Sequence, residues 1–326
     1  MKPILTFLIP LMLASCVTTN TPVIETSPVV INTPVNTESP PTHTSSPPTF
    51  SASPLPLTVT STVEPPCDPF LAEYCISAGH FLLQRPIRFP DNDRVDPSYR
   101  YGSSADGTRN PHHGVEFANA SGTPVYAAAD GTVVFAGPDE TAIYAPWPNY
   151  YGNLVVIEHP ASLFTLYAHL SKVDVEAGQQ ILSGDKLGEV GWTGTAAGSH
   201  LHFEVRQGNG EDYFATLNPE LWLIPPLDET GNSLGVLEMA IVGPNQELVN
   251  YAEFTIQYYP VPSGPAEISF YGTTYTADLL HSRENAVLGE LPAGHYRIVV
   301  DISGQFYERR VEVESGRLTQ VVFVAK

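Results

Sequence analysis

Alternating apolar and polar residues dominate the chain from about residue 123 onward. This period of two places successive side chains on opposite faces of an extended backbone, so it predicts β-strands. In the first half of this region the predicted strands are Pro124–Ala128, Thr132–Gly137, Asn153–His159, Leu163–Leu170, Val175–Gln179, Gly184–Gly191 and His200–Val205. Turns that contain glycine separate them, and no amphipathic helical period is found. The pattern therefore predicts a compact antiparallel β-domain.

A second series of alternating segments follows Trp222, after a linker that contains prolines and a glycine. The predicted strands are Val236–Val242, Ala252–Tyr258, Glu267–Tyr271, His295–Val300, Tyr307–Val313 and Leu318–Val324. Several short strands with turn signals favour a β-sandwich. With its turn at Leu291–Gly294, this part resembles the small transthyretin-like or immunoglobulin-like sandwiches. We therefore expect a mostly β protein, with one folded domain at 67–224 and a sandwich accessory domain at 233–326.

In the first 15 residues a positive start, a short apolar run and small residues follow one another, as in a bacterial lipoprotein signal peptide. Lys2 gives a positive start, and the apolar run Ile4–Leu13 is too short to span a bilayer as a permanent helix. The sequence Leu13–Cys16 resembles a lipobox, which implies cleavage before Cys16 and attachment of lipid to its thiol. An ordinary secretory signal peptide with an incidental cysteine is the alternative. Both interpretations place the mature chain outside the cytoplasm, and the first predicts a membrane-anchored lipoprotein of a bacterial envelope.

Residues 16–66 are rich in threonine, serine and proline and carry almost no charge. Such a segment buries too little apolar surface to offset the entropy lost on ordering, so it is predicted to be a linker. In a polyproline conformation about 50 residues would extend on the order of 150 Å. The linker would therefore hold a folded head well away from a membrane.

Charge and cysteine content narrow the possible partners. A formal net charge of -20 argues against nucleic acid, which requires a basic surface, and against electrostatic attraction to anionic lipids. Of the three cysteines, Cys16 belongs to the lipobox, and Cys67 and Cys75 remain. In an oxidising compartment this pair most simply forms a disulfide, and two reduced buried thiols are the alternative.

Four histidines and one glutamate on predicted extended segments mark a candidate metal site. His200 and His202 project from the same face of a strand, where two imidazoles can bind one metal or divide metal binding and proton transfer between them. His112 and Glu116 also share a face of an extended segment, and His169 ends an apolar strand. Catalytic zinc commonly has three protein ligands and one open position. His112, Glu116 and one histidine of the pair would supply those ligands, with the other histidines beside them.

These residues belong to motifs that resemble the lysostaphin-type (LytM-like) zinc metallopeptidases, which cut peptide cross-bridges in bacterial cell walls. The matching motifs are His112–Glu116, Gly122–Ala127, Asp130–Val133, Tyr167–Leu170, Gly178 with Gly184–Asp185, Gly191–Gly194 and His200–Glu204. Several motifs in the same order are far more specific than any one of them. The resemblance covers roughly residues 100–222.

The resemblance implies a zinc-dependent endopeptidase that hydrolyses peptide bonds in peptidoglycan stem or cross-bridge peptides. It makes His112, Glu116 and His202 the zinc ligands, and His169 and His200 the catalytic pair. The family usually has aspartate as its second ligand, whereas this chain has the longer Glu116, and glutamate is also a good zinc ligand. The alternative function is a non-catalytic protein on the same scaffold that binds cell wall or activates a hydrolase.

Aromatic residues are concentrated in a loop predicted between two strands, Pro138–Gly152. This loop carries four aromatic side chains as candidate substrate-binding residues: Tyr144, Trp147, Tyr150 and Tyr151. Exposed aromatic side chains beside an active groove suit stacking on sugar or peptide. The alternative is that they pack together as a small core of the loop itself.

Overall fold

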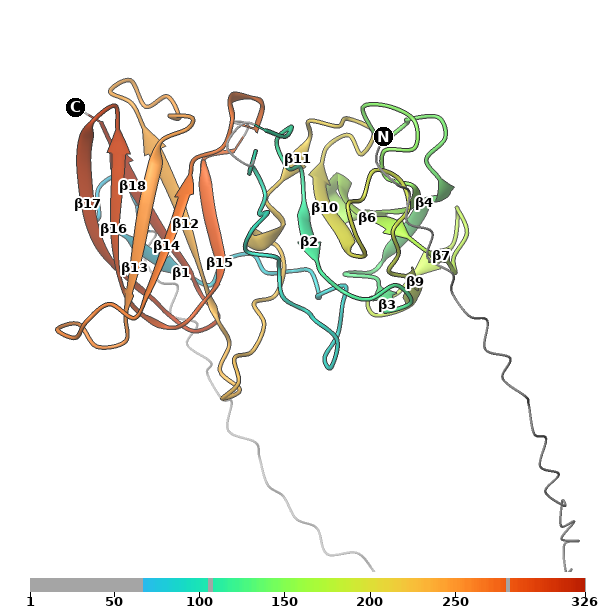
Figure 1. Ribbon diagram of the computed structural model, residues 1–326, viewed down its shortest axis with the longest axis horizontal. Coiled ribbons are helices and arrows are strands. Elements are labelled where there is room, and N and C mark those ends of the chain that lie inside the picture. The colour runs from blue at the N-terminus through green and yellow to red at the C-terminus, as the bar shows by residue number, and fades with distance from the viewer. Residues whose placement is uncertain (1–66, 105–107, 280–281, 326) are drawn as a thin grey trace, which may run out of the picture. The chain divides into compact units, whose positions relative to one another are not determined.

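The computed structural model describes residues 67–104, 108–279 and 282–325 (Figure 1). Regular structure in these residues is β-strand apart from three 3-10 helices, η1 (Pro160–Ser162), η2 (Pro219–Leu221) and η3 (Ala277–Leu279). The prediction of a mostly β fold is therefore confirmed. The predicted signal peptide, lipidation site at Cys16 and linker lie outside the described residues. None of the helices described here has the length and apolar character needed to cross a membrane.

The first large sheet has seven strands, and every pair in it is antiparallel. Its strand order is β11-β10-β6-β5-β4-β8, with β2 paired to the same edge of β10 as β11. The strands are β2 (Val115–Phe117), β4 (Gly131–Pro138), β5 (Asn153–His159), β6 (Leu163–Leu170), β8 (Gln180–Ile181), β10 (Leu201–Gln207) and β11 (Thr216–Leu217). This arrangement places β10 in the interior of the sheet, between β6 on one side and β2 with β11 on the other.

A small sheet completes this part of the protein, with the order β3 (Pro124–Tyr126), β9 (Lys186–Glu189) and β7 (Lys172–Val173). One prediction is wrong here: Val175–Gln179 is not a strand. A turn closes instead, in which the Gln179 N–H donates to the Glu176 carbonyl over 3.1 Å. Gly178 in this turn has φ of 89°, a left-handed conformation that a regular strand does not contain.

Strand β10 separates an apolar layer from a polar one. Leu201, Phe203 and Val205 point into the main hydrophobic core and are fully buried. The alternate residues His202, Glu204 and Arg206 form the other face, and they are buried as well. Because buried polar groups require partners, this second face must carry an organised network of hydrogen bonds and charges.

The remaining strands form a β-sandwich, as the sequence predicted. Its two sheets have the orders β1-β18-β12-β15 and β14-β13-β16-β17, with an apolar core that contains Met239, Ile256, Ile298 and Val321. The strands are β1 (Cys75–Ser77), β12 (Gly235–Val242), β13 (Glu253–Tyr259), β14 (Ile268–Thr273), β15 (Ala286–Leu291), β16 (Gly294–Ile302), β17 (Gln305–Val313) and β18 (Leu318–Val324).

The strand order adds two features that the sequence did not indicate. Strand β15 was not predicted, and β1 joins the sandwich by pairing with β18, far from it in sequence. Cys67 and Cys75 form a disulfide at the start of β1. The domain limits 67–224 and 233–326 stay a prediction, because β1 connects the beginning of the first range to the second.

Candidate metal centre

His112 lies on the segment just before β2 and is buried. Its Nδ1 is 2.9 Å from the backbone carbonyl oxygen of Tyr99, and its ring stacks on the Tyr99 ring with centroids 4.1 Å apart. A carbonyl oxygen only accepts hydrogen bonds, so Nδ1 carries the hydrogen and Nε2 keeps a free lone pair. Burial, and then the neighbouring His202, lower the pKa of His112 well below its ordinary value.

His202 on β10 carries its hydrogen on Nε2, the opposite tautomer to His112, because an oxygen acceptor lies beside that nitrogen. Its Nε2 lies 2.9 Å from Oε1 of Glu204, which also accepts from the Tyr151 hydroxyl. Although burial opposes ionisation, the Arg206 guanidinium and the hydrogen bond from His202 hold the pKa of Glu204 well below its ordinary value. The carboxylate therefore accepts the hydrogen of His202 Nε2, and Nδ1 is left as the free lone pair.

The two free lone pairs face each other, with His112 Nε2 and His202 Nδ1 3.1 Å apart. When both rings are neutral, neither of these nitrogens has a hydrogen to donate, and a cation between them satisfies both. Two nitrogens bound to zinc at about 2.0–2.1 Å in tetrahedral geometry lie roughly 3.4 Å apart. The spacing of the two rings therefore fits a zinc ion.

Glu116 comes from β2 and lies directly opposite His202 in the β2–β10 register. Its Oε1 is 3.8 Å from His112 Nε2 and 3.5 Å from His200 Nε2. One potential ligand atom from each of Glu116, His112 and His202 lies within 4.8 Å of the others. The structure thus brings together the three residues predicted as ligands, while metal binding itself stays a prediction.

A β-bulge turns His169 toward this group. The partners of β5 shift by one residue so that Ala168 and His169 of β6 both face Leu154, and His169 has φ of 63°. In a regular strand His169 would point to the opposite face from Ala168, the direct partner of His202. The bulge instead brings its ring centroid to 5.7 Å from that of His202 and 4.9 Å from that of His200.

His169 and His200 share one hydrogen-bonding arrangement. His169 Nδ1 is 2.9 Å from the Thr193 carbonyl, and His200 Nδ1 is 2.9 Å from the Gly198 carbonyl, so both keep Nε2 free. His200 Nε2 is buried without a hydrogen-bond partner. Burial lowers the pKa of both rings, that of His169 to about 3 with further contributions from His202 and His200. The predicted catalytic pair therefore consists of two neutral imidazoles beside the predicted ligands.

The four predicted substrate-binding residues do not share one environment. Tyr144 and Tyr151 are buried, and Tyr151 makes its hydrogen bonds to Glu204 and Arg206. Trp147 is 44% exposed and packs edge-on against Tyr150 at 4.8 Å between centroids. Tyr144 and Tyr151 are thus buried against the neighbouring strands, and a surface contact with substrate is left to Trp147 and Tyr150.

Three contributors to the site were missed in the sequence. Glu204 carried a detectable signal, because it lies two residues beyond His202 and shares its face of the strand. Arg206, two residues further along the same face, carried the same signal. Tyr99 acts through its carbonyl and ring, and a backbone carbonyl gives no sequence signal.

Fold and site together define a β protein with a His/Glu/His group beside two further histidines, the composition of a mononuclear metal centre. Residues 110–214 match the model of Peptidase family M23. This chain therefore contains a Peptidase family M23 domain, and the resemblance to lysostaphin-type peptidases is confirmed.

Individual relatives match the same part of the chain. Peptidoglycan DD-endopeptidase ShyA of Vibrio cholerae is 39% identical over 141 residues, which are 41% of this chain and 30% of the relative. Uncharacterized lipoprotein YgeR of Escherichia coli is 34% identical over 143 residues, 44% of this chain and 49% of the relative. A crystal structure of a zinc-containing peptidase from Vibrio cholerae is 34% identical, covers 38% of this chain and 36% of its own, and has a TM-score of 0.31. This chain thus spans less than half the length of either curated relative.

Proposed function

We propose that this chain is a zinc-dependent endopeptidase that hydrolyses peptide bonds in the stem or cross-bridge peptides of peptidoglycan. The observation that carries the proposal is the pair of facing ring nitrogens of His112 and His202, 3.1 Å apart, each on a ring whose other nitrogen lies 2.9 Å from an oxygen acceptor. Glu116 adds a negative charge beside them, which a divalent cation requires in a buried position. His112, Glu116 and His202 would hold the zinc and leave an open position for substrate.

Zinc in such a set supplies Lewis acidity, which polarises a carbonyl oxygen and makes water a nucleophile near neutral pH. His200 and His169 would then act as the proton-transfer residues. The free Nε2 of His200, 3.5 Å from Glu116 Oε1, lies where it can accept a proton from the attacking water. His169, whose Nδ1 is held by the Thr193 carbonyl, keeps its Nε2 for a hydrogen bond to the substrate carbonyl or to the leaving amine.

The substrate class rests on the relatives. ShyA, named a peptidoglycan DD-endopeptidase, is 39% identical over the matched segment, which supports peptidoglycan as the polymer that is cut. Trp147 and Tyr150, on the loop between β4 and β5, would contact the peptide or the neighbouring sugar.

We also propose an extracytoplasmic, membrane-anchored location and a tethered arrangement. Residues 1–15 would be removed as a signal peptide, lipid would be attached to Cys16, and residues 16–66 would connect the anchor to the folded domains at 67–224 and 233–326. The relative in Escherichia coli that is named a lipoprotein supports this assignment. A long linker would let a membrane-anchored enzyme reach its polymeric substrate.

Metal analysis of the purified chain, combined with digestion of purified peptidoglycan, tests the function. We expect about one zinc per chain and release of soluble fragments whose new termini identify the bond that is cut. Removal of zinc by a chelator should stop digestion, and readdition should restore it. A zinc-free chain that binds peptidoglycan without cutting it would replace this proposal with the non-catalytic, wall-binding or hydrolase-activating alternative.

A further inference from the structure

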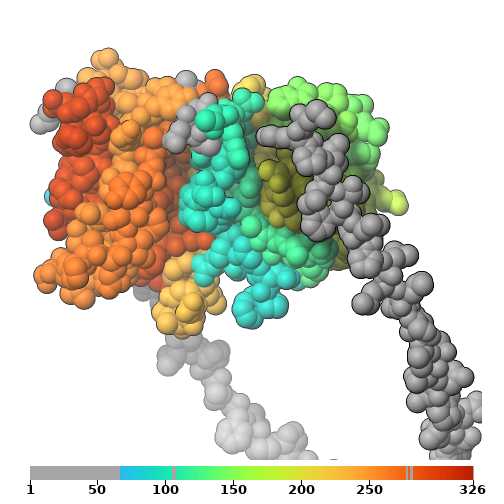
Figure 2. Space-filling model, in the orientation of Figure 1, coloured from blue at the N-terminus to red at the C-terminus, as the bar shows by residue number. Residues whose placement is uncertain are grey.

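A short stretch ahead of β2, residues 95–103, contacts both the candidate metal centre and the sandwich, and we call it the bridging segment. In Figure 2 this part of the chain, in cyan to teal, lies between the sandwich strands in orange to red and the strands of the first sheet in green to yellow. Its backbone forms hydrogen bonds with His112 and Glu116 of the candidate metal centre and with Glu290 of the sandwich.

On one side, the bridging segment holds two of the three proposed zinc ligands. The Tyr99 carbonyl accepts the Nδ1 hydrogen of His112 and thereby sets its tautomer. The backbone N–H of His112 donates to the Ser103 carbonyl over 2.9 Å. The backbone N–H of Asp96 donates to the carbonyl of Glu116 over 2.8 Å. A shift of this segment would therefore move the His112 ring and the backbone of Glu116 together.

On the other side, a β-bulge in the sandwich faces the bridging segment. Gly289 and Glu290 of β15 lie opposite the single residue Val236 of β12, and Glu290 has φ of 61°. A bulge interrupts the alternation of a strand and redirects a side chain out of its sheet. A left-handed backbone conformation is unfavourable for glutamate and persists where surrounding contacts fix it.

The carboxylate of Glu290 forms a hydrogen bond with the start of the bridging segment. Its Oε1 accepts the backbone N–H of Val95 over 3.0 Å and pairs with the Arg85 guanidinium over 2.8 Å. The side chains of Arg85 and Glu290 are only 10% and 9% exposed. A charged hydrogen bond at such a buried position fixes geometry more strongly than one on the surface.

Gly289, the other residue of the bulge, is linked to the middle of the bridging segment. The backbone N–H of Gly289 donates to Oε2 of Glu220 over 2.8 Å, and the same carboxylate pairs with Arg100. A Cβ atom at position 289 would lie 2.4 Å from that Oε2, so this approach requires glycine. Glu290 thus contacts the bridging segment at Val95, and Gly289 is linked to it at Arg100 through Glu220 of η2.

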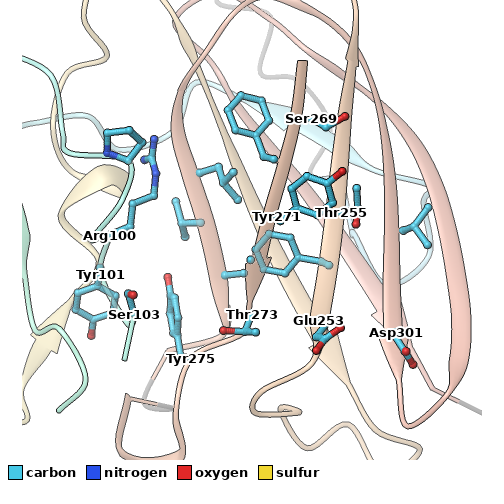
Figure 3. A pocket seen from close by; sticks show the side chains of 18 of the residues that line it. Arg100, Tyr101, Ser103, Glu253, Thr255, Ser269, Tyr271, Thr273, Tyr275 and Asp301 are labelled. Atoms are coloured by element: carbon cyan, nitrogen blue, oxygen red, sulfur yellow. The ribbon is translucent and has the colours of Figure 1, made fainter. Parts of the chain in front are cut away.

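Tyr275 of the sandwich supports the end of the segment. Its ring packs edge-on against Tyr101 with centroids 5.2 Å apart, and Figure 3 shows it beside Tyr101 and Ser103. Next to these contacts the segment borders an open cleft of about 1010 Å³, lined also by strands β13 and β14. The contacts of Glu290 with Val95 and of Tyr275 with Tyr101 are two points beside this cleft at which the sandwich holds the segment.

We propose that the sandwich is a positioning element of the metal centre: the Gly289–Glu290 bulge and Tyr275 hold the bridging segment so that Tyr99 keeps His112 oriented for zinc. The inference rests on the zinc site proposed above. Glu290 and Tyr275 are positioning residues, because they touch neither the ligands nor the reacting atoms.

Zinc affinity of the full chain, measured by competition with a chromogenic chelator, tests the role. Groups that orient metal ligands typically contribute 10–100-fold to affinity. We expect Glu290→Ala and Tyr275→Ala each to weaken zinc binding at least 10-fold. Glu290→Gln, which can still accept from Val95, should recover part of that loss. The absorption bands of the Co²⁺-loaded chain should shift in Glu290→Ala, because the ligand geometry changes.

The matched control is Ile298→Ala, which removes a fully buried side chain from the sandwich core and destabilises it without touching the bridging segment. We expect this variant to lower the melting temperature and to keep the zinc affinity of the unmodified chain. Unchanged affinity in both Glu290→Ala and Tyr275→Ala would overturn the inference, as would an equal loss in Ile298→Ala. Failure of the unmodified chain to bind zinc would overturn the proposed function itself.

Discussion

Glu116 and His202 are direct cross-strand partners where β2 pairs with β10. Directly opposite residues of antiparallel strands project from one face with Cβ atoms about 4.5–5.5 Å apart. Since the register fixes both backbones, the extra methylene of glutamate alters only how far the carboxylate reaches into the site. The fold therefore specifies the position of the acid, and the longer residue still comes within 3.8 Å of His112 Nε2.

Substitution of His202 on β10, and of His200 just before it, should separate zinc binding from proton transfer. We expect His202→Ala to lose zinc, because it removes one of the two facing lone pairs. His200→Ala should keep zinc and lower peptidoglycan cleavage by at least about 100-fold, the usual contribution of a general acid or base. Metal analysis and a cleavage assay on both purified variants provide the check. Cleavage by His200→Ala at the unmodified rate would remove His200 from the mechanism.

Glu204 is expected to act on both stability and zinc binding. In Glu204→Gln the fully buried Arg206 loses its counter-charge, which should cost about 3–5 kcal/mol of unfolding free energy. His202 also loses a charged acceptor at Nε2, so zinc affinity should fall about 10–100-fold.

The double variant Glu204→Gln/Arg206→Met distinguishes the two effects of Glu204. Removal of both charges should restore most of the stability seen in denaturant unfolding, since an apolar replacement of a buried pair is often close to neutral. Zinc affinity should stay low, because His202 still lacks the carboxylate. Recovery of zinc affinity along with stability would mean that Glu204 has only a structural role.

Gly114 is expected to tolerate no side chain. A Cβ atom there would lie 2.5 Å from the Phe203 carbonyl oxygen and 2.9 Å from Cε1 and Nε2 of the His202 ring. Gly114→Ala should lower the unfolding free energy by about 1–3 kcal/mol and weaken zinc binding, because the ring must move. Gly264→Ala, in a loop of the sandwich where the nearest atom to a new Cβ is 3.3 Å away, is the control. Equal zinc affinities in the two variants would contradict the expectation.

Trp147 should contribute to substrate binding and little to stability, because it is 44% exposed. Trp147→Ala is expected to lower retention on purified sacculi several-fold at an unchanged melting temperature. Tyr144→Ala, which empties a buried position in the same loop, should instead lower the melting temperature. A cosedimentation assay and thermal unfolding measure the two quantities. A stability loss without a binding loss in Trp147→Ala would assign Trp147 to packing alone.

Glu284 should make the stability of the sandwich depend on pH. Burial, with a smaller contribution from Glu238, raises the pKa of Glu284 to about 7, and its Oε1 is buried without a hydrogen-bond partner. Because the folded pKa lies above the unfolded value, the stabilisation is complete below about pH 4.5 and is lost as pH rises through about 7. The loss is on the order of 3 kcal/mol.

Glu284→Gln removes this dependence, since glutamine does not ionise. Relative to the unmodified chain, the variant should gain stability at pH 8 and show little gain at pH 4.5, as measured by denaturant unfolding at both values. The same stability difference at both pH values would exclude ionisation of Glu284 as the cause.

Long alternating runs were predictable and their limits were reproduced. Asn153–His159, Leu163–Leu170 and Leu318–Val324 are strands over the predicted residues, because they are rich in β-branched and aromatic residues and contain no glycine or proline. Ala286–Leu291 was missed, because Gly289 and Glu290 form a bulge and a bulge breaks the period of two. The same effect hid the orientation of His169, whose left-handed backbone reverses the face expected from its place in β6.

The site was predictable in its side chains and not in their orientation. The family motifs identified His112, Glu116 and His202, and the structure brings them together. The tautomers of His112, His169 and His200 depend instead on the carbonyls of Tyr99, Thr193 and Gly198, which every residue type possesses. Only the tertiary fold decides which carbonyl meets which ring, so composition and periodicity carry no record of it.

The position of the bulge in the sequence has a consequence for biosynthesis. His112 and Glu116 belong to the first half of the chain, yet the contacts that brace the segment holding them come from Gly289 and Glu290. During synthesis from the N-terminus, all the proposed ligands are present once residue 202 has been added. The bulge residues follow nearly ninety residues later, a delay of about 4–18 s at roughly 5–20 residues per second. On the positioning role proposed here, a nascent or prematurely truncated chain is a poor hydrolase, and cutting activity matures only with the sandwich.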